Sequence, residues 1–462
     1  MAERIVAAWY LLGQDNDFPP VNFDAFRPLA QENNSHVDVT GDHYKIEKAD
    51  VWFYRLVREM GAASTVLLKN VNGALPLKKP ITMSLIGSDA GPGTRGPNGY
   101  ADQGGLDGTL AMGWGSGTAN FTYLISASYN AIHPIQQRAQ ADHTTLDWWL
   151  KDWDTAGAAA MVAGKDVAVV FIASDSGEEY ITFDKNKGDR NNLTAWNNGD
   201  EMIKAVAAVN KNTVVVAHSV GPLILEPWVD HPNVTAILWA GLPGQESGNS
   251  LVDVLYGMYN PSGKLPYTIA RAPADYSAQV VYKDSSTQPQ IPYSEGLFID
   301  YRWFDAKNIT PRYEFGFGLS YTTFEYSKLN VARAKEVLEQ QLIWWDGGVS
   351  GNKTGASIET WLHEPLFKVL FTIKNIGKVS GKEVAQLYIS PPTSAGEPPN
   401  LLRGFEIVDL KPGQSKQVEL ELSRYDLSVW DVERQGWARM DGTVGVWVGG
   451  SSRDVKLKGE VF

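Results

Sequence analysis

The sequence predicts an α/β domain built on a mostly parallel sheet, followed by an all-β sandwich. Between residues 82 and 257, short apolar runs alternate with helix-like segments, which is typical of βαβ units whose sheet is covered on both faces. From about residue 366 the apolar residues recur at every second position, as in Val444, Val446 and Val448. Turn residues separate these runs, and the pattern favours a sandwich of about 100 residues.

The elements of the first block follow in order along the chain. On the apolar face of one expected helix, Met202, Ile203, Val206 and Val209 recur at helical spacing. The run at 166–173 is continuously apolar, which predicts a strand buried on both faces. The expected strands are 82–86, 166–173, 213–217 and 234–240, and the expected helices are 155–163, 200–209 and 246–256. At the other end, residues 1–17 read as an amphipathic helix, since no cleavage site for a signal peptide follows.

The composition excludes several classes of function. The formal net charge is −12, whereas a nucleic-acid-binding protein needs a basic face. No apolar run is long enough to span a bilayer, which takes about 18 residues. There is no cysteine, so thiol catalysis and disulfides are excluded. The seven histidines show no ligand spacing, and we therefore expect no cofactor and no catalytic metal.

Two short motifs have competing interpretations. The residues AHSVG around Ser219 follow a strand and resemble the nucleophile elbow of serine hydrolases. That elbow needs a helix immediately after the serine, and Pro222 disfavours one. The stretch FIASDSGEEY (171–180) places three carboxylates and a tyrosine where a buried parallel strand ends. Such an edge binds ligands in open α/β sheets, so one of these acids is either a partly desolvated general acid or part of a solvated loop.

The same stretch carries a family resemblance. The sequence SDSGEEYITFDKNKGDRNNLTAW resembles the SDSGEGY…GNxGDRxNLxLW segment of fungal β-glucosidases in glycoside hydrolase family 3. The likeness covers nearly the whole chain. It includes REMGAASTVLLKN at 58–70, GTLAMGWGSGTANFTY at 108–123, HSVGPLILEPW at 218–228, WAGLPGQESGNSLVDVLYG at 239–257, EGLFIDYRWFD at 295–305 and PRYEFGFGLSYTTF at 311–324.

The resemblance implies a barrel, an α/β sandwich and an immunoglobulin or fibronectin type III-like sandwich. We expect this chain to be the C-terminal portion of such an enzyme, without the catalytic barrel. The expected divisions are 1–58, the tail of the barrel and a linker; 59–270, the α/β sandwich; 271–335, a connector; and 336–462, the fibronectin type III-like domain.

The resemblance also implies the site residues. By motif alignment Glu178 is the general acid/base, Tyr180 stacks on the leaving-group sugar, and Ser116 contacts the glucose being cleaved. The nucleophilic Asp lies on the barrel, so the partners are β-glucoside oligosaccharides and that barrel. The sequence departs from the family pattern at Glu179, which replaces a glycine, and at Tyr100 and Gly105, where many relatives have a cysteine pair.

The resulting hypothesis is a secreted, extracellular, retaining β-glucosidase that hydrolyses cellobiose, cello-oligosaccharides and aryl β-glucosides. Six N-x-Ser/Thr sequons favour a secreted glycoprotein; they begin at Asn33, Asn120, Asn192, Asn233, Asn308 and Asn352. Two alternatives stay open at this point. One is a serine hydrolase that uses Ser219, and the other is a carbohydrate-binding module without catalytic activity.

Overall fold

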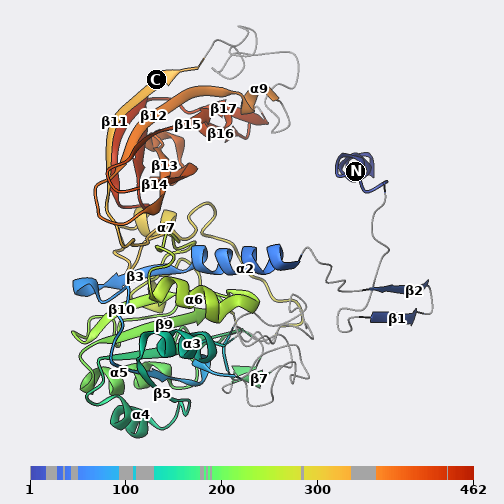
Figure 1. Cartoon of the computed structure of the whole chain (residues 1–462). Helices are drawn as coiled ribbons and strands as arrows, with labels where there is room; N and C mark the ends of the chain where they lie inside the picture. The colour runs from blue at the N-terminus through green and yellow to red at the C-terminus, as the bar shows by residue number, and fades with distance from the viewer. Residues whose placement is uncertain are drawn as a thin grey trace.

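The computed structural model describes the chain in two packed blocks joined by a connector (Figure 1). Helix α1 (Ala2–Leu11) and the hairpin of β1 (Leu29–Asn34) and β2 (Val37–Asp42) lie apart from these blocks in that view. The described residues are 2–16, 29–34, 37–42, 50–92, 108–110, 130–176, 182–183, 186–187, 190–281, 286–334, 360–433 and 435–462.

A six-stranded sheet forms the centre of the first block, in the order β3-β10-β9-β6-β4-β5. All neighbours pair in parallel except β3, which pairs antiparallel with β10. The strands are β3 (Val66–Asn70), β4 (Thr82–Ile86), β5 (Thr145–Trp149), β6 (Val167–Ser174), β9 (Thr213–Ser219) and β10 (Val234–Trp239). The predicted α/β domain with a mostly parallel sheet is confirmed.

Helices cover both faces of this sheet. On one face, α4 (Thr155–Val162) and α5 (Gly199–Val209) contribute to a core with the inward side chains of β6 and β9. On the other face, α3 (Ile132–Asp142) and α6 (Ser247–Leu255) contribute to a second core, which also contains Ala62 of α2 (Asp50–Ser64). The prediction for Val209 is wrong. Its side chain is 45% exposed, because it lies in the last turn of α5, where Ala207 is buried instead.

The second block is a sandwich of a three-stranded sheet, β11-β12-β15, and a four-stranded sheet, β14-β13-β18-β19. Inward residues such as Phe371, Val418 and Val446 alternate with outward ones, which confirms the predicted period of two. The strands are β11 (Phe324–Arg333), β12 (Pro365–Asn375), β13 (Gly381–Ser390), β14 (Leu401–Leu410), β15 (Ser415–Ser423), β18 (Val444–Gly449) and β19 (Val455–Val461). A further hairpin joins β16 (Ser428–Asp431) and β17 (Gly436–Arg439), and α9 (Thr360–His363) precedes β12.

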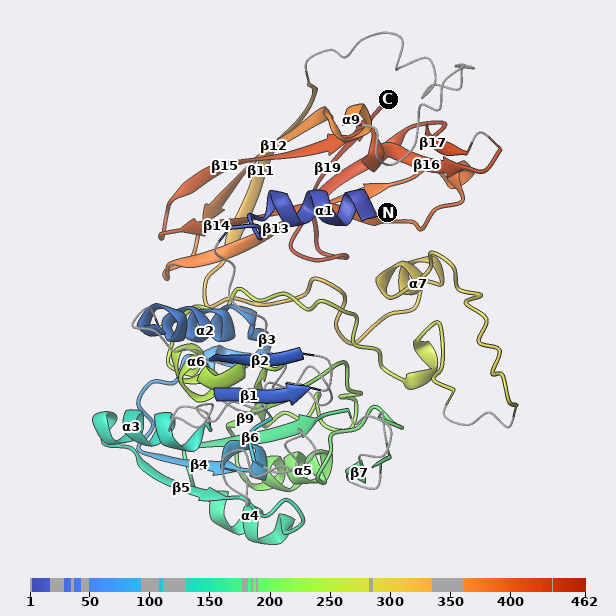
Figure 2. The same ribbon diagram turned by 90° about the vertical axis from the view of Figure 1, so that its right-hand side faces the viewer.

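The connector packs against both blocks. Leu319 forms a bridge with Leu67 of β3, and Ile269 forms one with Tyr313. Helix α7 (Tyr301–Ala306) lies between the blocks in Figure 2, and its Tyr301 packs on Tyr388 of the sandwich. Strand β11, which falls in the range expected for the connector, is hydrogen-bonded into the sandwich.

Candidate active site at the carboxyl edge of the sheet

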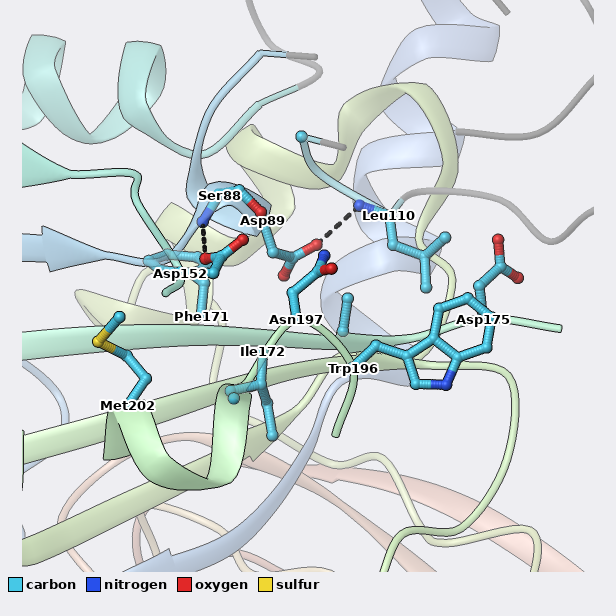
Figure 3. Close-up of a pocket in the computed structure, with 13 residues that line it drawn as sticks. Ser88, Asp89, Leu110, Asp152, Phe171, Ile172, Asp175, Trp196, Asn197 and Met202 are labelled. Carbon is cyan, nitrogen blue, oxygen red and sulfur yellow. Dashed lines mark hydrogen bonds between the residues drawn. The ribbon is translucent and has the colours of Figure 1, made fainter. Parts of the chain in front are cut away.

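The parallel strands β4, β6 and β9 end at one edge of the sheet, and buried polar residues follow them there. Asp89 comes after β4, Asp175 after β6, and His218 lies near the end of β9; each is at most 3% exposed. The carboxyl ends of neighbouring parallel strands are adjacent, so residues far apart in the sequence meet at this edge. A cavity of about 20 Å³ lies among them, lined by Asp89, Asp152, Asp175 and Trp196 (Figure 3). That volume holds about one water molecule and no sugar.

Gly87 lets the chain turn over the end of β6. Its φ angle is +101°, and a Cβ atom there would lie 2.3 Å from the carbonyl oxygen of Phe171. Any other side chain at this position would collide with the backbone of β6. The turn continues into the short helix η2 (Ser88–Ala90), which carries Asp89 over the strand ends.

The carboxylate of Asp89 joins three segments of the chain. Its Oδ1 accepts from the backbone N–H of Leu110 at 2.8 Å, as Figure 3 shows, and its Oδ2 lies 2.6 Å from Nδ1 of His218. A carboxylate can only accept, so Nδ1 of His218 donates. The hydroxyl of Thr109 also donates to the backbone oxygen of Asp89 at 2.7 Å. Asp89 therefore fixes the point from which the chain continues toward Ser116.

Asp152, which follows β5, fixes the neighbouring turn. Its Oδ1 accepts from the backbone N–H of Ser88 at 2.7 Å, drawn as the second dashed line in Figure 3. Its backbone oxygen accepts from Nδ2 of Asn198, just before α5, at 3.1 Å. These bonds hold the loops after β4 and β5 and the start of α5 together.

The stretch between Asp175 and Arg190 leaves and returns at the same strand end. The guanidinium of Arg190 donates to Oγ of Ser174 at 3.3 Å and to the backbone oxygen of Pro222 at 3.1 Å. The backbone N–H of Trp196 donates to the oxygen of Ala173 at 2.9 Å. Both ends of this stretch, which carries Glu178 and Tyr180, are thus attached to the end of β6.

Burial raises the pKa of one carboxyl group close to the cavity. Asp200 lies in the first turn of α5, beside the cavity-lining Gly199, and burial raises its pKa although Nε1 of Trp228 donates to it. A carboxyl group that projects into such surroundings keeps its proton to a higher pH than in water.

Of the predicted site residues, Glu178, Tyr180 and Ser116 lie outside the described residues, as do Glu179 and the sequons at Asn120 and Asn352. Asn33 lies in β1. Asn192 and Asn308 are exposed. Asn233 is half-buried, and its Nδ2 donates to the backbone oxygen of Ala207 at 2.8 Å.

Ser219 does not have the geometry of a nucleophile elbow. Its side chain is 3% exposed, its Oγ donates to the backbone oxygen of Gly221 at 2.6 Å, and residues 220–233, all described, form no helix. Its neighbour His218 faces Oγ of Ser247 at 3.5 Å, with Asp89 on the ring's other nitrogen. Although that order of side chains is the one found in serine hydrolases, all three are at least 97% buried, and neither His218 nor Ser247 lines the cavity. They form a structural link.

Sequence reasoning did not assign a role to Asp89 or Asp152. Asp89 follows an apolar strand run, as Asp175 does, and that position was the available signal; Asp152 follows β5, TLDWW, which has no such run. Within the described ranges, no group of His, Cys, Asp or Glu side chains has the arrangement of a metal site. No helix among them has the length and apolar composition that crossing a bilayer requires.

Comparisons with known proteins agree with this architecture. Residues 65–321 match the model of the glycosyl hydrolase family 3 C-terminal domain, and residues 383–452 match that of the fibronectin type III-like domain. The chain is 49% identical to "Probable beta-glucosidase L" of Aspergillus fumigatus and 45% identical to "Beta-glucosidase cel3A" of Pyricularia oryzae, over 99% of its own length in both cases. It spans 58% of the length of each of these relatives.

Solved structures are similar as well. The crystal structure of Beta-D-glucoside glucohydrolase from Trichoderma reesei superposes with a TM-score of 0.82 at 43% identity, covering 99% of this chain and 59% of that one. The β-glucosidase of Chaetomium thermophilum gives a TM-score of 0.87 at 37% identity, covering 98% of this chain and 62% of that one.

Proposed function

Because the chain belongs to glycosyl hydrolase family 3, we propose that it supplies the general acid/base, Glu178, to a retaining β-glucosidase. The observation that carries this proposal is the attachment of the 175–190 stretch to the end of β6 at both of its ends. In open α/β sheets ligands bind at this edge, which is where the proposed enzyme needs its general acid/base. Burial raises the pKa of Asp200, which follows the cavity-lining Gly199 at the same edge.

In the proposed mechanism, the nucleophile is an Asp on the N-terminal barrel that the family resemblance implies. This Asp attacks the anomeric carbon, while protonated Glu178 gives its proton to the departing glycosidic oxygen. Glu178, now ionised, then takes a proton from the water that cleaves the glucosyl-enzyme and releases β-glucose. Retention requires about 5 Å between the two carboxyl groups, so the site lies where the barrel meets the carboxyl edge of the sheet.

Glu178 is a better candidate than the adjacent Glu179. It occupies the position of the acid/base in the SGEGY pattern, and the tyrosine that follows that pattern is Tyr180. Glu178 must be protonated in the resting site, so activity falls as the pH rises through its pKa in the folded enzyme. A second carboxylate facing the same cleft would raise that pKa further.

The proposed substrates are β-linked glucosides, with Tyr180 stacked on the leaving-group sugar and Ser116 contacting the glucose that is cleaved. Aromatic rings suit the apolar face of a pyranose. We also propose that the protein is secreted and glycosylated at sequons that include the exposed Asn192 and Asn308. A mass decrease after endoglycosidase treatment that becomes smaller in Asn192→Gln with Asn308→Gln would support this.

The experiment for the proposed function is reconstitution. The chain is assayed with cellobiose and an aryl β-glucoside, alone and together with the N-terminal domain of the Aspergillus fumigatus relative. We expect essentially no hydrolysis by the chain alone, and hydrolysis with β-glucose as the first product when the N-terminal domain is added. Hydrolysis by the chain alone, or α-glucose as the first product, would contradict the proposal.

A further inference from the structure

Trp153 is the most exposed tryptophan among those whose exposure the structure describes. The residue is 69% exposed, and no hydrogen bond, ion pair or ring contact within the described part of the chain involves its side chain. Trp149, Trp228 and Trp239 of the same block instead each donate a hydrogen bond through Nε1. A single exposed apolar side chain is ordinary on a protein surface, so the position of Trp153 decides what it can do.

Trp153 lies at the carboxyl edge of the six-stranded sheet, in the turn between β5 and α4. The residue before it, Asp152, lines the cavity at this edge (Figure 3). The strand order places β4 between β6 and β5, so the ends of β6 and β5 are two strand spacings, about 10 Å, apart. Trp153 therefore shares this edge with the stretch that carries Glu178, but lies farther along it.

The turn that carries Trp153 is fixed on both sides. Before it, Oδ1 of Asp152 accepts from the backbone N–H of Ser88 at 2.7 Å. After it, Oδ1 of Asp154 caps the N-terminus of α4 at 2.9 Å, and the backbone oxygen of Asp154 accepts from Nε1 of Trp149 at 3.2 Å. Because the neighbours of Trp153 are held in place, a ligand that stacks on the indole orders little additional backbone when it binds.

The residues around Trp153 suit a neutral ligand with hydroxyl groups. The exposed Lys151 lies over the ring of Trp149, with its Nζ 5.1 Å from the ring centroid, and its ammonium group can donate to a hydroxyl. An anionic ligand would instead meet two carboxylates in the same turn, those of Asp152 and Asp154. A flat apolar ring beside a donor suits a pyranose, which has C–H faces and hydroxyl edges.

We propose that Trp153 forms an outer binding site for a glucosyl unit on the leaving-group side of a cello-oligosaccharide. This inference rests on the proposed function, because it takes the position of the scissile bond from Glu178. Cellobiose has only one sugar on the leaving-group side, and a single ring is shorter than the separation between the ends of β6 and β5. Trp153 therefore contacts only longer oligosaccharides, and its stacking favours their binding without taking part in proton transfer.

The first test is the dependence of hydrolysis on chain length in the reconstituted enzyme. For Trp153→Ala, we expect the kcat/KM on cellopentaose, divided by that on cellobiose, to fall about threefold to tenfold through a higher KM for cellopentaose. Trp153→Tyr, which keeps an aromatic ring, should retain most of this ratio. The control is Trp430→Ala, at a residue that is 44% exposed on the β16–β17 hairpin, and it should leave the ratio unchanged.

A second test needs no hydrolysis and decides the matter if the reconstituted enzyme cleaves neither sugar. The full chain is run through native gels with and without hydroxyethyl cellulose, a soluble β-glucan. We expect the glucan to retard the wild type and Trp430→Ala, but not Trp153→Ala. No retardation of the wild type, or a loss of retardation in Trp430→Ala only, would contradict the inference.

The outcomes distinguish this inference from the proposed function. Hydrolysis of cellobiose with an unchanged ratio in Trp153→Ala would support the catalytic proposal and overturn the stacking site. No hydrolysis of either sugar by the wild type would contradict the catalytic proposal, and the gels would then test Trp153 by itself. If Trp153→Ala weakened the association of the chain with the N-terminal domain, measured by analytical ultracentrifugation, Trp153 would be a contact between domains, which would also overturn the inference.

Discussion

The carboxyl edge of the six-stranded sheet and the outer face of the sandwich both bury charged side chains, but they use them differently. At the edge, Asp89 binds Leu110 and His218, so one carboxylate joins loops that approach the proposed catalytic stretch. At the outer face of the sandwich, Asp305 of α7 accepts from Asn400 and Arg453, and these bonds join the helix to the sandwich. In a parallel sheet the carboxyl ends of strands that are distant in the sequence lie at one edge. An antiparallel sheet instead packs one whole face against the neighbouring element, here α7. We therefore expect the catalytic residues at the carboxyl edge, and a structural role for the contacts at the outer face of the sandwich.

The largest effect on stability is expected for Asp89→Ala. The change leaves Nδ1 of His218 and the N–H of Leu110 buried without their acceptor. We expect a loss of about 4 kcal/mol in the free energy of unfolding, measured by urea denaturation, and loss of activity in the reconstituted enzyme. Asp409→Ala, at an exposed position on β14, is the control, with a change within about 0.5 kcal/mol. Similar small losses for both would show that the edge is not held by Asp89.

Two glycine-to-alanine substitutions, one at the carboxyl edge and one in the sandwich, test the same comparison. Gly87→Ala places a Cβ atom 2.3 Å from the backbone oxygen of Phe171, whereas Gly413→Ala, in a turn of the sandwich, meets nothing within 4 Å. Both have positive φ angles. We expect a loss of about 3 kcal/mol for Gly87→Ala and about 1 kcal/mol for Gly413→Ala, from thermal unfolding. Equal losses would mean that only the φ angle matters at Gly87.

The next largest difference is expected between a partly buried ion pair and an exposed one. Arg312 of the connector donates to Glu226 and Asp230, and its side chain is 11% exposed; these carboxylates hold its pKa above the usual value. We expect Arg312→Ala to cost about 1.5 kcal/mol of unfolding free energy. Lys368→Ala, which breaks the exposed pair with Glu419, should give no measurable change. A loss at Lys368 as large as that at Arg312 would contradict this.

The smallest expected effect is a change in the pH dependence of the unfolding free energy. Burial raises the pKa of Asp200, so the folded protein keeps this proton to a higher pH than the unfolded chain does. The resulting stabilisation is complete below the unfolded pKa and is lost as the pH rises through the folded pKa. The wild type should therefore lose stability relative to Asp200→Asn as the pH rises above the ordinary aspartate pKa of about 3.9. The opposite slope, or an equal one in the exposed Glu201→Gln variant, would show that burial does not control Asp200.

Sequence periodicity identified β4, β6, β9 and β10 of the central sheet, but not β3, β5 or helix α3. The continuous apolar run at 166–173 reflects a strand that is buried on both faces, and the alternation of Val444, Val446 and Val448 reflects the inward face of β18. The outward Trp447 is also buried, which the alternation did not indicate. The error at Val209 arose because the end of a helix depends on what packs there. Asp89 and His218 are 129 residues apart, so only the parallel order of β4, β6 and β9 brings them together.

The most direct test of the central claim is the dependence of kcat/KM on the leaving group in the reconstituted enzyme. For Glu178→Ala, we expect a loss of about 10²- to 10⁴-fold on cellobiose and a much smaller loss on 2,4-dinitrophenyl β-glucoside, which needs no proton donor. Glu179→Ala, the matched control, should lose kcat/KM on neither substrate. If Glu179→Ala gave this pattern instead, or if Glu178→Ala lost the same factor on both substrates, Glu178 would not be the proton donor at the carboxyl edge.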